Sequence, residues 1–243
     1  MKRTERHHLK ENEFAEWLLG AKTWYEANSK LLGYVGIVAM LALAAVIATM
    51  AYRQWSAGKA SSALAEALAI AEAPVLPPAP SEAGKPPVQR PGTYATDRAR
   101  LEAALPKLMA VADAYPGSDA GIMARYRAAS ALVGVGRTQE GIQRYKEVVE
   151  RGKGAYAAMA RLGIGEAYLM AGQFDQAIAS FKEVESLKSD DVPVDGVLMQ
   201  LGRAYQLAGK TEDAKKAFKR VTDEFPQSPY AAAARREIEG SGA

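Results

Sequence analysis

The chain has 243 residues, of which 49% are hydrophobic and 24% are charged, so it has enough apolar surface to fold and is not a disordered polymer. Its formal net charge of +3, from 31 Lys and Arg against 28 Asp and Glu, does not indicate a nucleic-acid-binding protein, in which cations are concentrated on one face. Cysteine is absent and there are two histidines, which excludes disulfides and cysteine nucleophiles and leaves little material for a metal site.

Residues 1–30 form an arm that we expect to contain an amphipathic helix. Apolar side chains recur with helical spacing at Phe14, Trp17, Leu18, Ala21 and Trp24. Such a helix either contacts a partner at the membrane or only orients the segment that follows it. The pattern favours neither of these two interpretations.

Residues 31–52 form a long uncharged run that we predict to be a transmembrane helix. Such a helix is about 33 Å long, against a hydrocarbon core of about 30 Å. A cleaved signal peptide has a shorter apolar region behind a shorter leader, so we expect a permanent single-pass anchor. The arm carries Lys2, Arg3, Arg6, Lys10, Lys22 and Lys30. This excess of cations favours an N-terminus in the cytoplasm, with the residues after the span on the other side.

Residues 53–73 are rich in Ala, Leu and Glu, and we predict a helix that continues from the span. Prolines are then concentrated between Pro74 and Pro91. Because proline has no backbone N–H to donate, this segment is not expected to form a helix or to pair in a sheet. We predict an extended proline-rich loop over residues 74–96.

Three later segments share one spacing pattern, in which alanine, glycine, an aromatic residue and valine recur at offsets of 36 and 37 residues. The segments are Ala131-x4-Gly136-x8-Tyr145-x2-Val148, Ala167-x4-Gly172-x8-Phe181-x2-Val184 and Ala204-x4-Gly209-x8-Phe218-x2-Val221. Four positions kept in register three times indicate an internal repeat. Each glycine can end one helix, and the aromatic residue and valine share a face of the next. Each unit is therefore predicted to be a helical hairpin that stacks on its neighbours.

The ends of the array are also predicted from pattern. Residues 97–116 have the register of a second helix, whose first helix would be the segment 56–73, and Pro106 is expected to kink or restart the helix. Ser228 is expected to cap a final helix that has Pro229 in its first turn and runs to about Glu239.

The second and third units resemble the tetratricopeptide repeat. The residues that carry the resemblance are Ile164-Gly165-x-Ala167-Tyr168-x3-Gly172-x-Phe174-x2-Ala177-x3-Phe181 and Leu201-Gly202-x-Ala204-Tyr205-x3-Gly209-x4-Ala214-x3-Phe218. The first family position, usually Trp, is Arg161 in the unit that matches best. The resemblance implies an all-α fold, in which a single transmembrane helix precedes an α-solenoid of tetratricopeptide-like hairpins over residues 97–243, with a C-terminal capping helix.

The order of arm, span and repeat array resembles the bacterial ancillary subunit of the Sec translocon (the YfgM type). The closures Tyr115-Pro116-Gly117-Ser118 and Phe225-Pro226-Gln227-Ser228 also resemble the cell-division coordinator of the Tol–Pal system. These resemblances imply an inner-membrane scaffold with a cytoplasmic N-terminus, whose periplasmic array binds translocon subunits, periplasmic chaperones or other envelope proteins. The alternative is a self-associating structural component of envelope assembly or cell division, which would form homo-oligomers.

By family register, partners are expected to bind to the concave face that is built by the first helix of each hairpin. The residues expected to line it are Tyr126, Ser130, Glu166, Leu169, Met199, Arg203 and Gln206. No Walker, G-x-S-x-G or H-E-x-x-H motif occurs, and the pair Asp190-Asp191 is more simply a loop before a helix than a catalytic dyad. We therefore expect no enzyme activity, no cofactor and no metal.

Overall fold

The computed structural model describes residues 3–79, 89–187 and 192–240, with side chains from residue 16 onward. The chain divides into two compact units, Met1–Trp55 and Ser56–Ala243. The helices of the described residues are α1 (Arg3–Ala71), α2 (Asp97–Ala114), α3 (Asp119–Gly134), α4 (Thr138–Arg151), α5 (Ala155–Met170), α6 (Phe174–Ser186), α7 (Val194–Leu207), α8 (Thr211–Glu224) and α9 (Ala231–Gly240).

The first unit contains the apolar run of α1. In the part of the chain that the structure describes, α1 is the one helix long and apolar enough to cross a membrane, with a mean hydropathy of 2.5 in its most apolar window. None of that window is buried against other parts of the protein, whereas the core helix of a soluble protein would be mostly buried. Trp17, Leu18 and Trp24 are also exposed, while the side chain of Phe14 lies outside the described part.

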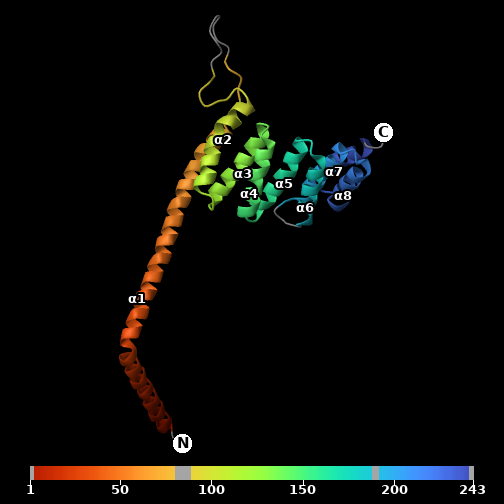
Figure 1. Cartoon of the computed structure of the whole chain (residues 1–243). Coiled ribbons are helices and arrows are strands. Elements are labelled where there is room, and N and C mark those ends of the chain that lie inside the picture. Colours follow the sequence, from red (N-terminus) through yellow and green to blue (C-terminus); the bar gives the residue numbers. More distant parts are fainter. Residues whose placement is uncertain (1–2, 80–88, 188–191, 241–243) are drawn as a thin grey trace. The chain divides into compact units, whose positions relative to one another are not determined.

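The second unit is a row of helical hairpins, α3–α4, α5–α6 and α7–α8, that follow one another in chain order (Figure 1). This arrangement confirms the all-α repeat array predicted from the spacing pattern. Phe181 and Phe218, the repeated aromatic residues of the second and third hairpins, are completely buried. A hairpin cannot cover such a side chain alone, so stacking of neighbours stabilises the array.

The turn within each hairpin is fixed by the predicted glycine. Gly172 has φ +70°, a left-handed conformation that a residue with a Cβ adopts at a cost. Its N–H donates to the carbonyl of Leu169 at 3.1 Å, and the N–H of Gln173 donates to the carbonyl of Tyr168 at 2.9 Å. These two bonds satisfy carbonyls that would otherwise be unpaired at the end of α5. Gly136 and Gly209 have the same conformation, as the repeat predicted.

The end of α1 is built into the array as the first helix of an additional hairpin. Leu64 and Ala67 are buried in one cluster with Leu105 and Leu108 of α2. Arg100 also donates to the carbonyl of Ala73, just after α1, at 3.3 Å. The segment that follows the apolar run therefore contributes to the core of the repeats.

The proline-rich segment was not expected to pair with another strand, but its two ends do pair. Leu76 donates to the carbonyl of Tyr94 at 2.9 Å, and Tyr94 donates to the carbonyl of Pro74 at 3.0 Å, so Val75 and Tyr94 form an isolated parallel bridge. The pairing is possible because both donors are non-proline residues and Pro74 only accepts. Residues 80–88 lie outside the described part.

The structure bears on two predictions about prolines. Of the kink or restart expected at Pro106, the restart is excluded, because α2 runs through Pro106. Pro106 is exposed, so the carbonyl of Glu102, which loses its helical donor, lies on the side of α2 that faces water. Helix α9 begins at Ala231, so Pro229 precedes the helix instead of lying in its first turn. The Ser228 hydroxyl still accepts a hydrogen bond from the Tyr230 N–H at 3.0 Å.

Candidate partner-binding surface

The first helices of successive hairpins contact one another. Helix α3 contacts α5, and α5 contacts α7, in addition to the contacts that each makes with its chain neighbours. Within a hairpin, a small residue permits close approach of the two helices: a Cβ built on Gly165 of α5 would lie 2.5 Å from Cε1 of Phe181 on α6. We call the surface of α3, α5 and α7 that faces away from the second helices the first-helix face.

The predicted site residues all lie on α3, α5 and α7, but they are not equally accessible. Ser130, Glu166, Arg203 and Gln206 are exposed, and Tyr126 and Leu169 are half-buried. Met199 is only 4% exposed and belongs to the core cluster around Phe218. Its prediction as a surface residue is corrected, because its side chain lies in the core that forms where the hairpins stack.

The part of the site on α3 and α5 is an aromatic cluster with one carboxylate. The rings of Tyr126 and Tyr145 meet edge to face, with centroids 5.4 Å apart. Burial raises the pKa of Tyr145 far above its ordinary value, with smaller contributions from Tyr126 and Glu166, while a hydrogen bond with Ser130 lowers it. Burial, followed by the charge of Glu166, raises the pKa of Tyr126. The structure thus brings Tyr126, Ser130 and Glu166 together around Tyr145, which was predicted as a repeat residue but not as a site residue.

Glu166 is the charged group of this cluster. Burial of its carboxyl raises the pKa of Glu166 above the ordinary value, even though the residue as a whole is exposed. Within the described part of the chain, no cation forms an ion pair with it. A carboxylate that is partly desolvated and has no internal cation can accept a hydrogen bond or a cation from a partner.

The part of the site on α7 contains polar residues and no aromatic cluster. The amide of Gln206 donates to the carboxylate of Glu237 on α9 at 3.2 Å, so this residue is engaged by the capping helix. Arg203 is exposed and no described carboxylate pairs with it. The predicted residues therefore form a cluster on α3 and α5, a free cation on α7 and one contact with α9.

The sequence analysis missed the exposed apolar side chains of this surface. Met159 and Met170 of α5 are 40% and 70% exposed, and Leu207 of α7 is 57% exposed. Met170 and Leu207 occupy equivalent repeat positions, at the last residue of their helices. Met170 and Leu207 could have been predicted as exposed from the repeat alignment, because both stand at the end of a first helix, just before its glycine turn.

Sequence comparison agrees with this architecture. Tetratricopeptide-repeat family models match residues 126–192 and residues 168–238. These matches support the assignment of the hairpins within 126–238 to tetratricopeptide repeats. Among proteins of curated function, no significant sequence match to the chain was found.

A solved structure supports the same fold. A putative kinesin light chain from Podosopora anserina with nearly identical tetratricopeptide-like repeats is 16% identical, with a TM-score of 0.50, over 58% of this chain and 77% of that chain. BtubC from P. vanneervenii is 14% identical, with a TM-score of 0.47, over 58% of this chain and 59% of that chain. At 16% identity, the likeness to the kinesin light chain shows the fold alone.

Tetratricopeptide repeats indicate a protein–protein interaction scaffold, and this fold is typically not catalytic. The pair Asp190-Asp191, which the sequence analysis placed in a loop, lies outside the described residues.

Proposed function

We propose that this chain is a membrane-anchored scaffold of the bacterial cell envelope, whose tetratricopeptide array binds envelope proteins through the first-helix face. The exposure of Met159, Met170 and Leu207 on first helices carries the proposal. Exposed apolar side chains that share one face with unpaired charges are typical of surfaces that bind proteins. Glu166 and Arg203 supply those charges, which can select the partner.

The anchor and its orientation belong to the same proposal. The unburied apolar window of α1 supports a membrane span, and the cations of residues 1–30 support a cytoplasmic N-terminus. The array would then face the periplasm. The order of arm, span and array supports a role like that of an ancillary Sec translocon subunit, with translocon subunits or periplasmic chaperones as partners.

The topology is tested first. The chain has no cysteine, so a single introduced cysteine reports one position. Thr4→Cys places a thiol in the arm, and Lys216→Cys places one on α8, where Lys216 is exposed. A membrane-impermeant maleimide is expected to label Lys216→Cys in intact spheroplasts and Thr4→Cys only after lysis. The reverse labelling would refute a periplasmic array.

The partner surface is tested with a photo-crosslinking amino acid at Met170, with Lys216 as an equally exposed control on a second helix. Crosslinks at Met170 to a second kind of polypeptide, absent at Lys216, are expected. Crosslinks only to another copy of this chain would support the self-associating structural component instead. Equal crosslinking at both positions would contradict a specific first-helix face.

A further inference from the structure

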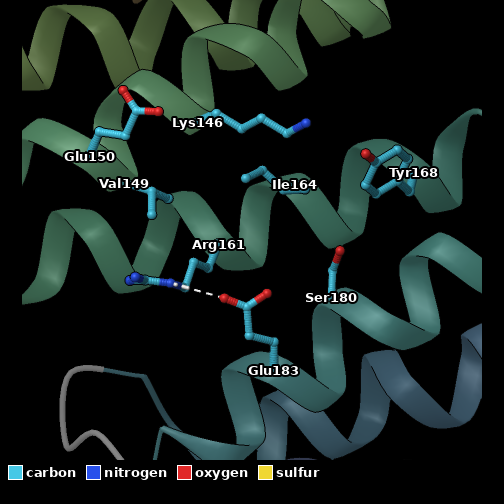
Figure 2. Close-up of a pocket in the computed structure, with 8 residues that line it drawn as sticks. All are labelled: Lys146, Val149, Glu150, Arg161, Ile164, Tyr168, Ser180 and Glu183. Carbon is cyan, nitrogen blue, oxygen red and sulfur yellow. Dashed lines mark ion pairs between the residues drawn. The ribbon is translucent and has the colours of Figure 1, made fainter.

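A pocket lies on the opposite side of α5 from the first-helix face. It has a volume of about 350 Å³ and is lined by Lys146, Val149 and Glu150 of α4, Arg161, Ile164 and Tyr168 of α5, and Ser180 and Glu183 of α6 (Figure 2). At 100° per residue, Arg161, Ile164 and Tyr168 project roughly opposite to Glu166 and Leu169. We call it the second-helix pocket, because it opens between the second helices of two successive hairpins.

The pocket depends on two residues, each of which differs from its equivalent in one of the two neighbouring repeats. At the next junction Leu198, completely buried, occupies the position of Arg161. Arg161 is instead turned toward Glu183, with 3.5 Å between Nε and Oε1 (Figure 2). At the preceding junction the position of Ser180 is occupied by Arg144, which pairs with Asp113 and Glu147. A small serine and an arginine turned aside leave the space between α4 and α6 unfilled.

One end of the pocket carries a cation without an internal partner. The Lys146 side chain extends over Ile164 toward Tyr168 (Figure 2). No described residue forms an ion pair or hydrogen bond with its ammonium group. The equivalent lysine of the next repeat, Lys182, is engaged differently, with its Nζ 5.5 Å from the ring centroid of Tyr205. That ring is buried, whereas Tyr168 is half-buried and borders the pocket.

The residues that line the pocket favour a carboxylate over a phosphate group. The hydroxyls of Tyr168 and Ser180 can donate hydrogen bonds, and Val149 and Ile164 provide an apolar wall. Glu150 and Glu183 also line the pocket and Arg161 is paired with Glu183, so the pocket offers one unpaired cation and lacks the several cations that a phosphate group favours. A single carboxylate on an aliphatic stem fits both the free ammonium group and the apolar wall.

We propose that the second-helix pocket binds a glutamate side chain of a protein partner, with its carboxylate paired to Lys146 and its methylene groups packed against Val149 and Ile164. The array would then bind protein on two faces. The first-helix face would supply apolar contacts, and this pocket would supply one charge-specific contact. The two surfaces lie on opposite sides of α5. A negative binding result at the pocket therefore does not contradict the proposed function of the first-helix face, and the reverse also holds.

The test uses the full-length chain in detergent and a blocked glutamate, N-acetyl-glutamate N-methylamide, as the probe. Binding is measured by saturation-transfer NMR, with the blocked glutamine as the neutral counterpart. We expect the glutamate probe to bind and the glutamine probe not to bind. Lys146→Gln should weaken binding about tenfold, which is the effect of losing one charged hydrogen bond.

Three further variants make the assignment specific. Lys182→Gln, the matched control, should leave binding unchanged, because that lysine lies against Tyr205. Ser180→Ala should weaken binding, and Arg161→Leu, which copies Leu198, should fill the pocket and abolish binding while the protein remains folded. Equal loss in Lys146→Gln and Lys182→Gln, or equal binding of both probes, would overturn the proposal. Tighter binding of free glutarate than of the blocked glutamate would overturn the assignment to a protein partner.

Discussion

At the residue scale, the glycine beneath the repeated aromatic ring of the second and third hairpins is sharply constrained. A Cβ added at Gly165 would lie 2.5 Å from Cε1 of Phe181, which is completely buried and cannot move aside. We expect Gly165→Ala to lower the free energy of unfolding by about 1–3 kcal/mol through overpacking. The measurement is denaturant unfolding of the full-length protein in detergent, followed by circular dichroism. Gly117→Ala is the control, because a Cβ there meets no atom within 4 Å. An equal effect of both substitutions would contradict the steric explanation.

Glu166 gives a pH dependence at the same scale. Burial raises its pKa in the folded state, so the folded protein holds the proton more tightly than the unfolded chain does. The contribution of this group to stability is present below the ordinary pKa of 4.5 and is lost as the pH rises through the raised value. Glu166→Gln should therefore melt at a higher temperature than the wild type at pH 7, and the difference should vanish at pH 4.

The control for this prediction has the opposite sign. The Arg137 guanidinium lowers the pKa of Glu140, so Glu140 favours the folded state at neutral pH and loses that effect as the pH falls through the lowered value. Glu140→Gln should not raise the melting temperature at pH 7. If Glu166→Gln and Glu140→Gln shift the melting temperature in the same direction at pH 7, the interpretation of Glu166 is wrong.

At the scale of the elements, a buried arginine joins α2, α3 and α4. Arg125 is 3% exposed, donates to the carbonyl of Ala112 at 2.7 Å, and has its Nε 2.9 Å from Oε2 of Glu147. Glu147→Ala would leave part of this buried charge without a partner, and should lower the free energy of unfolding by about 2 kcal/mol. The double variant Arg125→Met/Glu147→Ala removes both charges and should recover most of that loss, as chemical denaturation would show. A double variant less stable than Glu147→Ala alone would contradict this account.

At the scale of the whole molecule, the last helix, α9, covers the apolar end of the repeat array. Ala231 and Ala234 of α9 are buried, and Ala234 belongs to the core cluster around Phe218. Removing residues 226–243 would expose that cluster. Because repeats are stabilised mainly by their neighbours, we expect amide hydrogen exchange in α7 and α8 to accelerate about tenfold or more, while α3 is little affected. Exchange that accelerates equally along the array would show that it unfolds as one unit.

Features at these three scales differ in how well the sequence predicts them. The spacing of Gly136, Gly172 and Gly209 predicted the hairpin turns, because a left-handed backbone conformation is a local requirement that glycine meets. Pro229 was placed in the first turn of the last helix but precedes it, and of the two outcomes expected at Pro106 the structure excludes a restart. Helix α2 can continue through Pro106 because the carbonyl that loses its donor faces water, and the sequence alone does not show which side of a helix faces water.

The site was predicted only in part, for a related reason. The register placed all seven predicted residues on first helices, but it could not show that Met199 is buried in a core cluster or that Tyr145 joins Tyr126 and Glu166. The second-helix pocket also could not be predicted from the sequence. Arg161 was recognised as unusual, yet its effect depends on where its side chain turns and on which residues of α4 and α6 lie beside it.

The sequence by itself determined the apolar segment, the repeat period and the all-α fold, because helical periodicity and glycine turns act over a few residues. Only the tertiary structure decided which side chains are exposed and which neighbours they meet. Arg125 and Arg161 show the difference: they occupy equivalent repeat positions, yet one is sealed in the core and the other borders a pocket. The cause is packing, since burial depends on the volumes of residues that lie far apart in the chain and meet only when the hairpins stack.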